Sequence, residues 1–300
     1  MSNKADYIGR FAPSPSGPLH FGSLVAALAS YLDARSAHGL WLLRMEDLDP
    51  AREPPAAAAQ ILSTLEAFGL YWDGPVLYQS QRLGAYADAL ANLQERGLIY
   101  SCDCSRVQIQ AMGGVYDNRC RLRQLQQTAG ALRIVVPDEI FEFVDTIQGP
   151  QQQNLLHECG DFVLRRKDGL FAYQLAVVVD DAFQNITHIV RGSDLLDSTP
   201  RQLYLQKLLG FPSLHYAHIP VAVNNEGQKL SKQHFAAPLD LQQPTTHLLA
   251  ALQFLGQFPG RHPDPHLATA TPMELLAWGT EHWDIQAVPK LATIPLQSGS

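Results

Sequence analysis

Apolar residues in the first third of the chain follow an order that alternates between strand and helix. Residues 7–11 (YIGRF) form a short apolar run, and the residues after the next loop are apolar at helical spacing: Phe21, Leu24, Val25, Leu28 and Leu32. A second apolar run at 40–47 precedes another helical pattern, at Ile61, Leu62, Leu65 and Phe68. Because strands that alternate with helices are typical of a parallel sheet, we expect an α/β fold.

The pattern changes twice further along the chain. A third helix is expected around Tyr86, Leu90 and Leu93, after which residues 102–160 look irregular and rich in Gln, Arg and Cys, as in an insertion. Three apolar runs at 161–169, 171–181 and 186–192 then predict that the sheet resumes, followed by a helix around Leu205, Leu208 and Leu209. We therefore expect a catalytic domain over 1–240 with an insertion at 102–160. Residues 241–300, with Leu248, Leu249, Leu252 and Leu255 at helical spacing, would form a small helical subdomain.

Composition narrows the class of protein. The chain has 300 residues, 22 Lys and Arg against 29 Asp and Glu, and a net charge of -7, which disfavours a protein that coats nucleic acid by bulk positive charge. No apolar run approaches the roughly 18 residues of a membrane span, and the N-terminus has no secretory pattern. We expect a cytoplasmic monomer that binds no membrane.

The loop between the first strand and the first helix has the properties of a phosphate site. It reads Arg10-Phe-Ala-Pro-Ser-Pro-Ser-Gly-Pro-Leu-His-Phe-Gly-Ser23. Gly17 and Gly22 let the backbone approach a ligand, the helix N-terminus offers free N–H groups, and His20 can donate to phosphate oxygens. The alternative is an ordinary strand-to-helix turn.

A second candidate is Lys229-Leu-Ser-Lys232, which follows a turn at 224–227. Two lysines around a serine can stabilise a triphosphate as its charge rearranges. By itself, this segment is more typical of a solvated lysine loop.

Taken together, the two segments resemble the HIGH and KMSKS motifs of class I aminoacyl-tRNA synthetases, in the form found in glutamyl- and glutaminyl-tRNA synthetases. Three further segments match the family in order: Leu43–Asp47 an acidic segment, Tyr173–Asp181 a substrate-wall strand, and Val190–Asp194 an Arg-Gly segment. The resemblance implies a Rossmann-like parallel sheet with a zinc-bearing insertion and a small helical C-terminal part. It also implies an ATP-dependent ligase.

The resemblance implies a role for individual residues. Those expected around a bound glutamate are Arg10, Ala12, Ser14, Glu46, Tyr173 and Arg191. The two arginines suit the two carboxylates of glutamate, Glu46 suits its ammonium group, and the Tyr173 hydroxyl suits the side-chain end. Those expected to bind ATP with Mg²⁺ are His20, Gly22 and Lys232, and those expected to stabilise charge during catalysis are His20, Lys229 and Lys232. Without the motifs, a structural ion pair would be the favoured interpretation of Arg191 and Glu46.

Two departures from the family pattern bear on substrate. Val177 stands four residues after Tyr173, where glutamyl-tRNA synthetases carry Asn, and this indicates a pocket that activates glutamate without tRNA. The chain also ends about seventy residues after Lys232, which leaves no room for anticodon-binding domains. This length resembles a branch of the family that attaches glutamate to the queuosine base in the anticodon of tRNA-Asp. Alternatives are a truncated synthetase that charges a tRNA 3′ end, a non-catalytic paralogue that binds RNA or a partner, and a nucleotidylyltransferase.

Three of the four cysteines suggest a metal site in the insertion. Cys102, Cys104 and Cys120 would fill three positions of a tetrahedral zinc shell. The resemblance implies Tyr116 as the fourth ligand, whereas Cys159 and His157 are more ordinary donors, and three reduced thiols without metal remain an alternative. Five arginines also indicate an RNA-facing element or, alternatively, a solvated loop: Arg106, Arg119, Arg121, Arg123 and Arg133.

Overall fold

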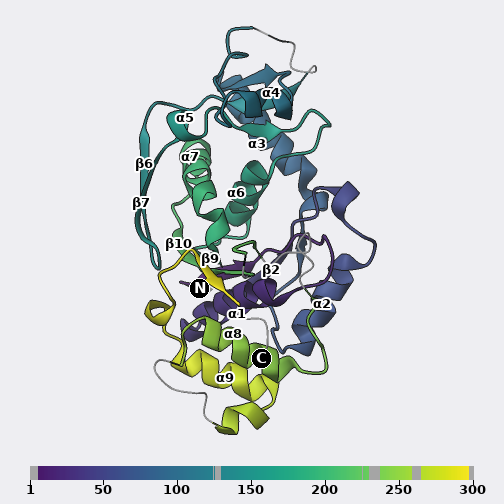
Figure 1. Cartoon of the computed structure of the whole chain (residues 1–300). Helices are drawn as coiled ribbons and strands as arrows, with labels where there is room; N and C mark the ends of the chain where they lie inside the picture. The colour runs from purple at the N-terminus through teal and green to yellow at the C-terminus, as the bar shows by residue number, and fades with distance from the viewer. Residues whose placement is uncertain are drawn as a thin grey trace.

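Parallel strands lie at the centre of the molecule, with helices on both sides (Figure 1). The computed structural model describes residues 6–123, 125, 130–224, 226–229, 237–258 and 265–296. One parallel sheet has the order β1 (Ile8–Phe11), β2 (Leu40–Met45) and β3 (Leu77–Tyr78). A second has the order β7 (Gly149–Asn154), β6 (Ile140–Asp145), β10 (His215–Ile219) and β9 (His188–Gly192), in which only β6 and β7 are antiparallel.

The two sheets adjoin along β1 and β9. The backbone N–H of Thr187, directly before β9, donates to the Ile8 carbonyl at 2.9 Å, and the Ile8 N–H donates to the Thr187 hydroxyl at 2.8 Å. The carboxyl ends of β1, β2 and β9 therefore point to the same edge, where parallel α/β folds place their ligand sites.

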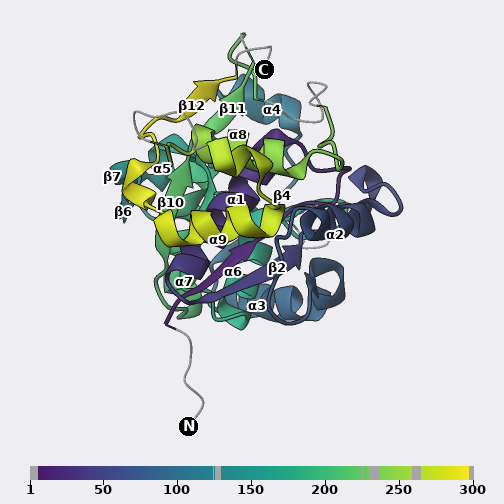
Figure 2. The ribbon, with the colours of Figure 1, turned by 90° about the horizontal axis from the view of Figure 1, so that it is seen from below.

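Four helices share one apolar core with β1 and β2. They are α1 (Phe21–Ser36), α2 (Ala57–Ala67), α8 (Pro244–Phe254) and α9 (Pro272–His282). Seen from below, α8 and α9 lie across α1 (Figure 2). A Cβ on Gly279 would lie 3.2 Å from the Leu32 side chain, so the glycine allows α9 to approach α1 closely. Among the described residues, none of the helices combines the length and the apolar character needed to cross a membrane.

A second core lies on the other side of the sheets. Its helices are α3 (Leu83–Glu95), α6 (Tyr173–Phe183) and α7 (Thr199–Leu209), and they pack with α5 (Leu155–Glu158). An antiparallel sheet of β4 (Ile99–Cys102), β5 (Ala131–Ile134) and β8 (Val163–Arg165) leads into the cysteine-rich insertion, which carries α4 (Arg106–Ala111). The short strands β11 (Val221–Val223) and β12 (Thr293–Pro295) pair in parallel.

The expected parallel sheet is confirmed, but the expected strand at 171–181 is wrong. Residues 173–183 form α6, and every residue from Gln174 to Asp181 is buried. Because every residue from 174 to 181 is buried, the helix has no exposed polar face that would distinguish it from a buried strand. Its three consecutive valines favour a strand by intrinsic preference, and packing in the second core overrides that preference.

The irregular structure expected over 102–160 is also wrong for its second half. Residues 131–154 contain β5, β6 and β7, and the last two form an antiparallel hairpin. Exposed and less exposed positions alternate along β7, whose sequence is GPQQQN. A strand of glutamines has no apolar alternation, so the sequence pattern did not reveal it.

Candidate functional site

A cavity of about 690 Å³ opens at the carboxyl ends of β1, β2 and β9. All six residues expected around glutamate line it: Arg10, Ala12, Ser14, Glu46, Tyr173 and Arg191. His20, Gly22 and Lys229 line the same cavity, whereas Lys232 lies outside the described residues. The structure thus brings the loop from Arg10 to Ser23 together with Glu46, Tyr173 and Arg191, which come from distant parts of the sequence.

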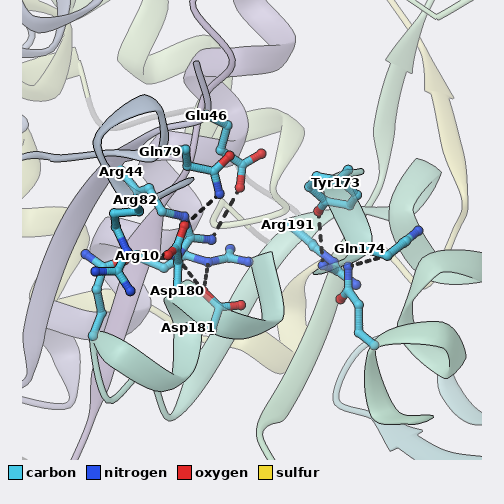
Figure 3. A network of polar contacts seen from close by, with 12 residues as sticks. Arg10, Arg44, Glu46, Gln79, Arg82, Tyr173, Gln174, Asp180, Asp181 and Arg191 are labelled. Atoms are coloured by element: carbon cyan, nitrogen blue, oxygen red, sulfur yellow. Dashed lines mark hydrogen bonds and ion pairs between the residues drawn. The ribbon is translucent and has the colours of Figure 1, made fainter. Parts of the chain in front are cut away.

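A buried ion-pair cluster supports one side of the cavity. Asp181, near the end of α6, accepts from Arg44 Nη1 at 2.7 Å and from Arg10 Nε at 3.3 Å. Arg44 also donates from Nη2 to Glu46 at 3.3 Å (Figure 3). Among the described residues, Arg10 makes no hydrogen bond through its two terminal nitrogens, so that end of the guanidinium is available to a carboxylate.

Burial and charge oppose each other in the acidic members of this cluster. Burial raises the pKa of Glu46, and Arg44 and Arg10 only partly offset that rise. Burial would also raise the pKa of Asp181, but the same two arginines outweigh it and hold the pKa below its ordinary value. Asp181 is therefore a fixed anion for the arginines, while Glu46 gains from a cation in the cavity.

Arg191 and Tyr173 form the other side of the pocket. Arg191 Nη1 lies 3.5 Å from the Tyr173 hydroxyl, as Figure 3 shows, and both side chains face the cavity. Tyr173 is the first residue of α6, and the helix places it beside β9, the strand that carries Arg191. Burial raises the pKa of Tyr173, so the hydroxyl stays protonated and can donate.

His20 caps the helix that follows the phosphate loop. Its Nδ1 accepts from the Ser23 backbone N–H at 3.3 Å, so a neutral ring carries its proton on Nε2. That proton is a donor suited to a phosphate oxygen, and it lies at the N-terminus of the helix, where the helix dipole also favours an anion.

Lys229 follows a tight turn that Asn224 and Gly227 build. The Asn224 side-chain oxygen accepts from the backbone N–H groups of residues 226 and 228, at 3.1 and 2.8 Å, and Gly227 adopts φ 74°. Lys229 pairs with Asp194 at 2.5 Å, and both residues line the cavity. The lysine is held by a surface carboxylate that a phosphate would have to displace.

Val177 does not belong to the cavity. It is fully buried in the second core, one helical turn after Tyr173. Val177 therefore has no direct contact with the cavity through which it would change the glutamate pocket.

Sequence reasoning missed the charged residues that hold the pocket in place. Arg44 and Asp181 are at most 2% exposed, and so are His218 and Asp145, which form a buried pair at 2.6 Å behind Arg191. Asp180 binds a separate group: it accepts from Gln79 Nε2 at 2.8 Å, and from Arg82 Nε and the Tyr86 hydroxyl, both at 2.6 Å. The available indication in the sequence was Asp180 and Asp181, which end the apolar run at 171–181, because carboxylates in such a run need buried partners.

The cysteine cluster forms in the insertion as the sequence predicts. The sulfur atoms of Cys102, Cys104 and Cys120 all lie within 4.8 Å of one another. The Tyr116 side chain is buried, and its oxygen accepts from the Cys120 backbone N–H at 3.1 Å. These three thiols could hold a metal ion, since four tetrahedral ligands at ~2.3 Å place sulfurs ~3.8 Å apart.

The rival fourth ligands lie elsewhere. His157 is exposed and pairs with Asp138 at 3.0 Å, and Cys159 packs against the second core. Neither belongs to the cysteine cluster among the described residues. Of the donors considered, Tyr116 is the one that remains beside the thiols.

The arginines of the insertion are mostly paired. Arg119 and Arg123 bind Asp117 and Asp103 at 2.6 and 2.7 Å. Arg121 binds the buried Asp161 at 2.6 Å, and Arg133 is itself buried with its guanidinium 3.9 Å from the centre of the Tyr116 ring. The side chain of Arg106 lies outside what the structure describes. The insertion is therefore less basic at its surface than its sequence indicates.

Comparisons with known proteins agree with this geometry. Residues 8–247 match the family described as tRNA synthetases class I (E and Q), catalytic domain. A Pseudomonas putida protein named Glutamyl-Q tRNA(Asp) synthetase is 54% identical over 293 residues, which cover 98% of each chain.

The chain is also similar in structure to solved glutamate-tRNA synthetases. The glutamate-tRNA synthetase from Elizabethkingia anophelis superposes with a TM-score of 0.80 at 25% identity, over 97% of this chain and 68% of that protein. A glutamate tRNA ligase from Elizabethkingia meningosepticum, solved in complex with its amino acid, gives a TM-score of 0.78 at 25% identity, over 97% and 67% of the two chains.

Proposed function

The chain belongs to the class I tRNA synthetases of the glutamate and glutamine type, and from this premise we propose that it activates glutamate with ATP and transfers it to the queuosine base in the anticodon of tRNA-Asp. The observation that carries the proposal is the single cavity in which two buried arginines, Glu46 and the His20 loop meet. Similarity over 98% of a relative with this activity in its name supports the acceptor.

The first step would form an acid anhydride. A carboxylate oxygen of glutamate attacks the α-phosphorus of ATP, the bond to the β-phosphate breaks, and glutamyl-adenylate and pyrophosphate result. Arg10 and Arg191 would hold the two carboxylates, and Glu46 the ammonium group. His20 Nε2–H, Gly22 and the lysines Lys229 and Lys232 would stabilise the phosphate charge, with Mg²⁺ bound to the ATP.

The second step would transfer the glutamyl group. A ring hydroxyl of queuosine attacks the activated carbonyl, an ester bond forms, and AMP leaves. A wobble base in a single-stranded loop can splay out into such a cavity. No covalent bond to the enzyme is needed in either step.

We propose that activation does not require tRNA. Asp181 already holds Arg10, and His218 and Thr199 already hold Arg191, without any contribution from RNA. A pocket whose cations are fixed by the protein is preorganised for its substrate.

Two linked assays test this function. Glutamate-dependent exchange of pyrophosphate into ATP is expected in the enzyme alone, and aspartate is expected not to replace glutamate. Labelled glutamate is then offered with tRNA-Asp whose 3′ ribose has been oxidised with periodate while queuosine was protected. We expect labelling of this RNA and none of tRNA-Asp without queuosine. Labelling that requires an intact 3′ end would instead establish a synthetase that charges tRNA.

We propose that zinc is the metal of the insertion, bound by Cys102, Cys104, Cys120 and Tyr116. Three thiolates and one further oxygen donor complete a tetrahedral shell, and four protein ligands leave no open position for substrate. The zinc would therefore be structural.

Elemental analysis checks the metal site. We expect about one zinc per chain in the purified protein, and a loss of most of it in Cys120→Ser, since structural zinc needs its full ligand set. Tyr116→Phe should bind zinc more weakly against a competing chelator. Cys159→Ser is the matched control and should keep its zinc. Less than about a tenth of an equivalent in protein never exposed to chelator would reject the site, and an unchanged affinity in Tyr116→Phe would reject that ligand.

A further inference from the structure

The guanidinium of Arg191 is fixed by neighbours on three sides. Its Nε donates to His218 Nε2 at 2.9 Å, and its Nη2 donates to the Thr199 hydroxyl at 2.9 Å and to the Leu195 carbonyl at 3.3 Å. Among the described residues, Nη1 makes only the long contact of 3.5 Å with the Tyr173 hydroxyl. The planar group is thereby oriented so that the Nη1 end, beside Tyr173, faces the cavity.

The contact with Arg191 determines where His218 carries its proton. A guanidinium only donates hydrogen bonds, so His218 Nε2 must be an unprotonated acceptor. The ring proton then lies on Nδ1, and Asp145 Oδ2 accepts it at 2.6 Å. The histidine is fully buried, so no water competes for either ring nitrogen.

Asp145 is in turn held by the backbone. Its Oδ1 accepts three N–H bonds, from residues 147, 148 and 218, at 3.0, 2.9 and 3.1 Å. These bonds fix the carboxylate at the end of β6 and leave Oδ2 directed at His218. A continuous chain of hydrogen bonds thus runs from the backbone through Asp145 and His218 to Arg191.

We propose that His218 is a positioning residue for glutamate binding: Asp145 selects the His218 tautomer that accepts from Arg191, and this holds the guanidinium in the orientation that binds a substrate carboxylate. The inference rests on the proposed function, because it assigns Arg191 to the substrate. His218 and Asp145 do not line the cavity, so they act only through Arg191.

The same geometry predicts a loss of glutamate affinity in acid. The charged and polar groups that face His218 are Asp145 from β6, Arg191 from β9, Arg10 from β1 and the Thr199 hydroxyl from α7, and Tyr216 stacks on it from its own strand. Protonation of Nε2 would turn the acceptor into a donor and place a cation against Arg191. Burial lowers the pKa of His218 despite Asp145, so the ring is neutral near pH 7 and the loss begins only below the ordinary histidine range.

Asp145→Asn is the most direct test. The asparagine oxygen can still accept the backbone N–H bonds, but its amide would donate to His218 Nδ1 and drive the ring proton to Nε2, where it opposes the Arg191 donor. In pyrophosphate exchange at pH 7.5 we expect the KM for glutamate to rise about 10- to 100-fold, as for loss of a hydrogen bond to a charged group. The KM for ATP should stay within about twofold, since this chain of bonds does not reach the phosphate loop.

His218→Gln keeps a neutral acceptor near the Nε2 position. It should retain most of the wild-type affinity for glutamate at pH 7.5 and remove the loss of affinity in acid that protonation of His218 causes. Asp161→Asn, at a buried carboxylate that does not line the cavity, is the matched control and should leave the KM for glutamate unchanged.

Nuclear magnetic resonance of wild-type protein labelled with ¹⁵N-histidine reports the tautomer of His218 directly. The signal of His218 is identified by its absence from the spectrum of His218→Gln. A proton on Nε2 at pH 7.5 would overturn the proposal. So would an Asp145→Asn enzyme with an unchanged KM for glutamate, or one in which the kinetic constants for both substrates deteriorate equally, as in a merely structural defect. Absence of glutamate-dependent exchange in the wild type would instead reject the proposed function.

Discussion

Replacing Arg191 by alanine is expected to lower kcat/KM for glutamate in pyrophosphate exchange by roughly 30- to several-thousand-fold, because loss of one partner of a buried charge pair costs ~2–5 kcal/mol. Arg191 is 5% exposed and lies against Tyr173, so no water could replace it at a bound carboxylate without rearrangement. The KM for ATP should change far less. Steady-state exchange kinetics with each substrate varied in turn measure the effect.

Two further variants make this result interpretable. Arg191→Lys keeps the charge but loses the planar fork and its bonds to His218 and Thr199, so we expect only partial recovery. Lys207→Ala removes an exposed cation that pairs with Glu139 on the surface and should match the wild type. An Arg191→Ala enzyme within about threefold of wild type would mean that the substrate carboxylates bind elsewhere.

Replacing Asp181 by alanine is expected to lower the melting temperature by on the order of 10 °C. The change leaves Arg10 and Arg44 buried with a shared partner missing, and breaking a buried ion pair from one side costs ~3–5 kcal/mol. In a chain of this size each kcal/mol corresponds to roughly 2–4 °C. Thermal unfolding followed by circular dichroism measures the shift.

The direction of the Asp181 pKa shift determines how this stabilisation depends on pH. The pKa of Asp181 lies below its ordinary value in the folded protein, so the stabilisation is complete above the unfolded pKa of about 4 and is lost as pH falls through the folded value. The difference between wild type and Asp181→Ala should therefore narrow in acid. Asp138→Ala, which removes an exposed carboxylate, should leave the melting temperature within about 2 °C. An equally small change in Asp181→Ala would contradict the role given to the cluster.

Periodicity in the sequence predicted the helices whose core-facing apolar residues recur every three or four positions. Helices α1, α2 and α3 appear where the apolar spacing placed them. The same reasoning failed for α6, which is buried on all sides, and for β7, which has no apolar face. In both cases tertiary packing decides the structure, and a local pattern carries no information about it.

In the candidate site too, the sequence predicted some residues and not others. Residues that would touch substrate could be named from motifs, and the structure places Arg10, Tyr173 and Arg191 in one cavity. The groups that orient them could not be named, because their partners are distant in sequence: Asp181 lies 171 residues from Arg10 and Asp145 lies 73 from His218. A residue that acts only by orienting another side chain has no fixed distance from it along the sequence, so no motif reveals it.

The helix behind the phosphate loop depends on the far end of the chain for its packing. About 200 residues separate the end of α1 at Ser36 from the start of α8 at Pro244, yet both helices share one core. A ribosome that adds ~5–20 residues per second needs roughly 10–40 s to make that segment. During that interval the apolar face of α1, with Leu24, Leu28 and Leu32, has neither α8 nor α9 to cover it. Contacts between such distant segments also form slowly, since a long loop must close first. The newly made chain therefore presents this face to chaperones, and to other unfinished chains, before the loop that precedes α1 can be supported.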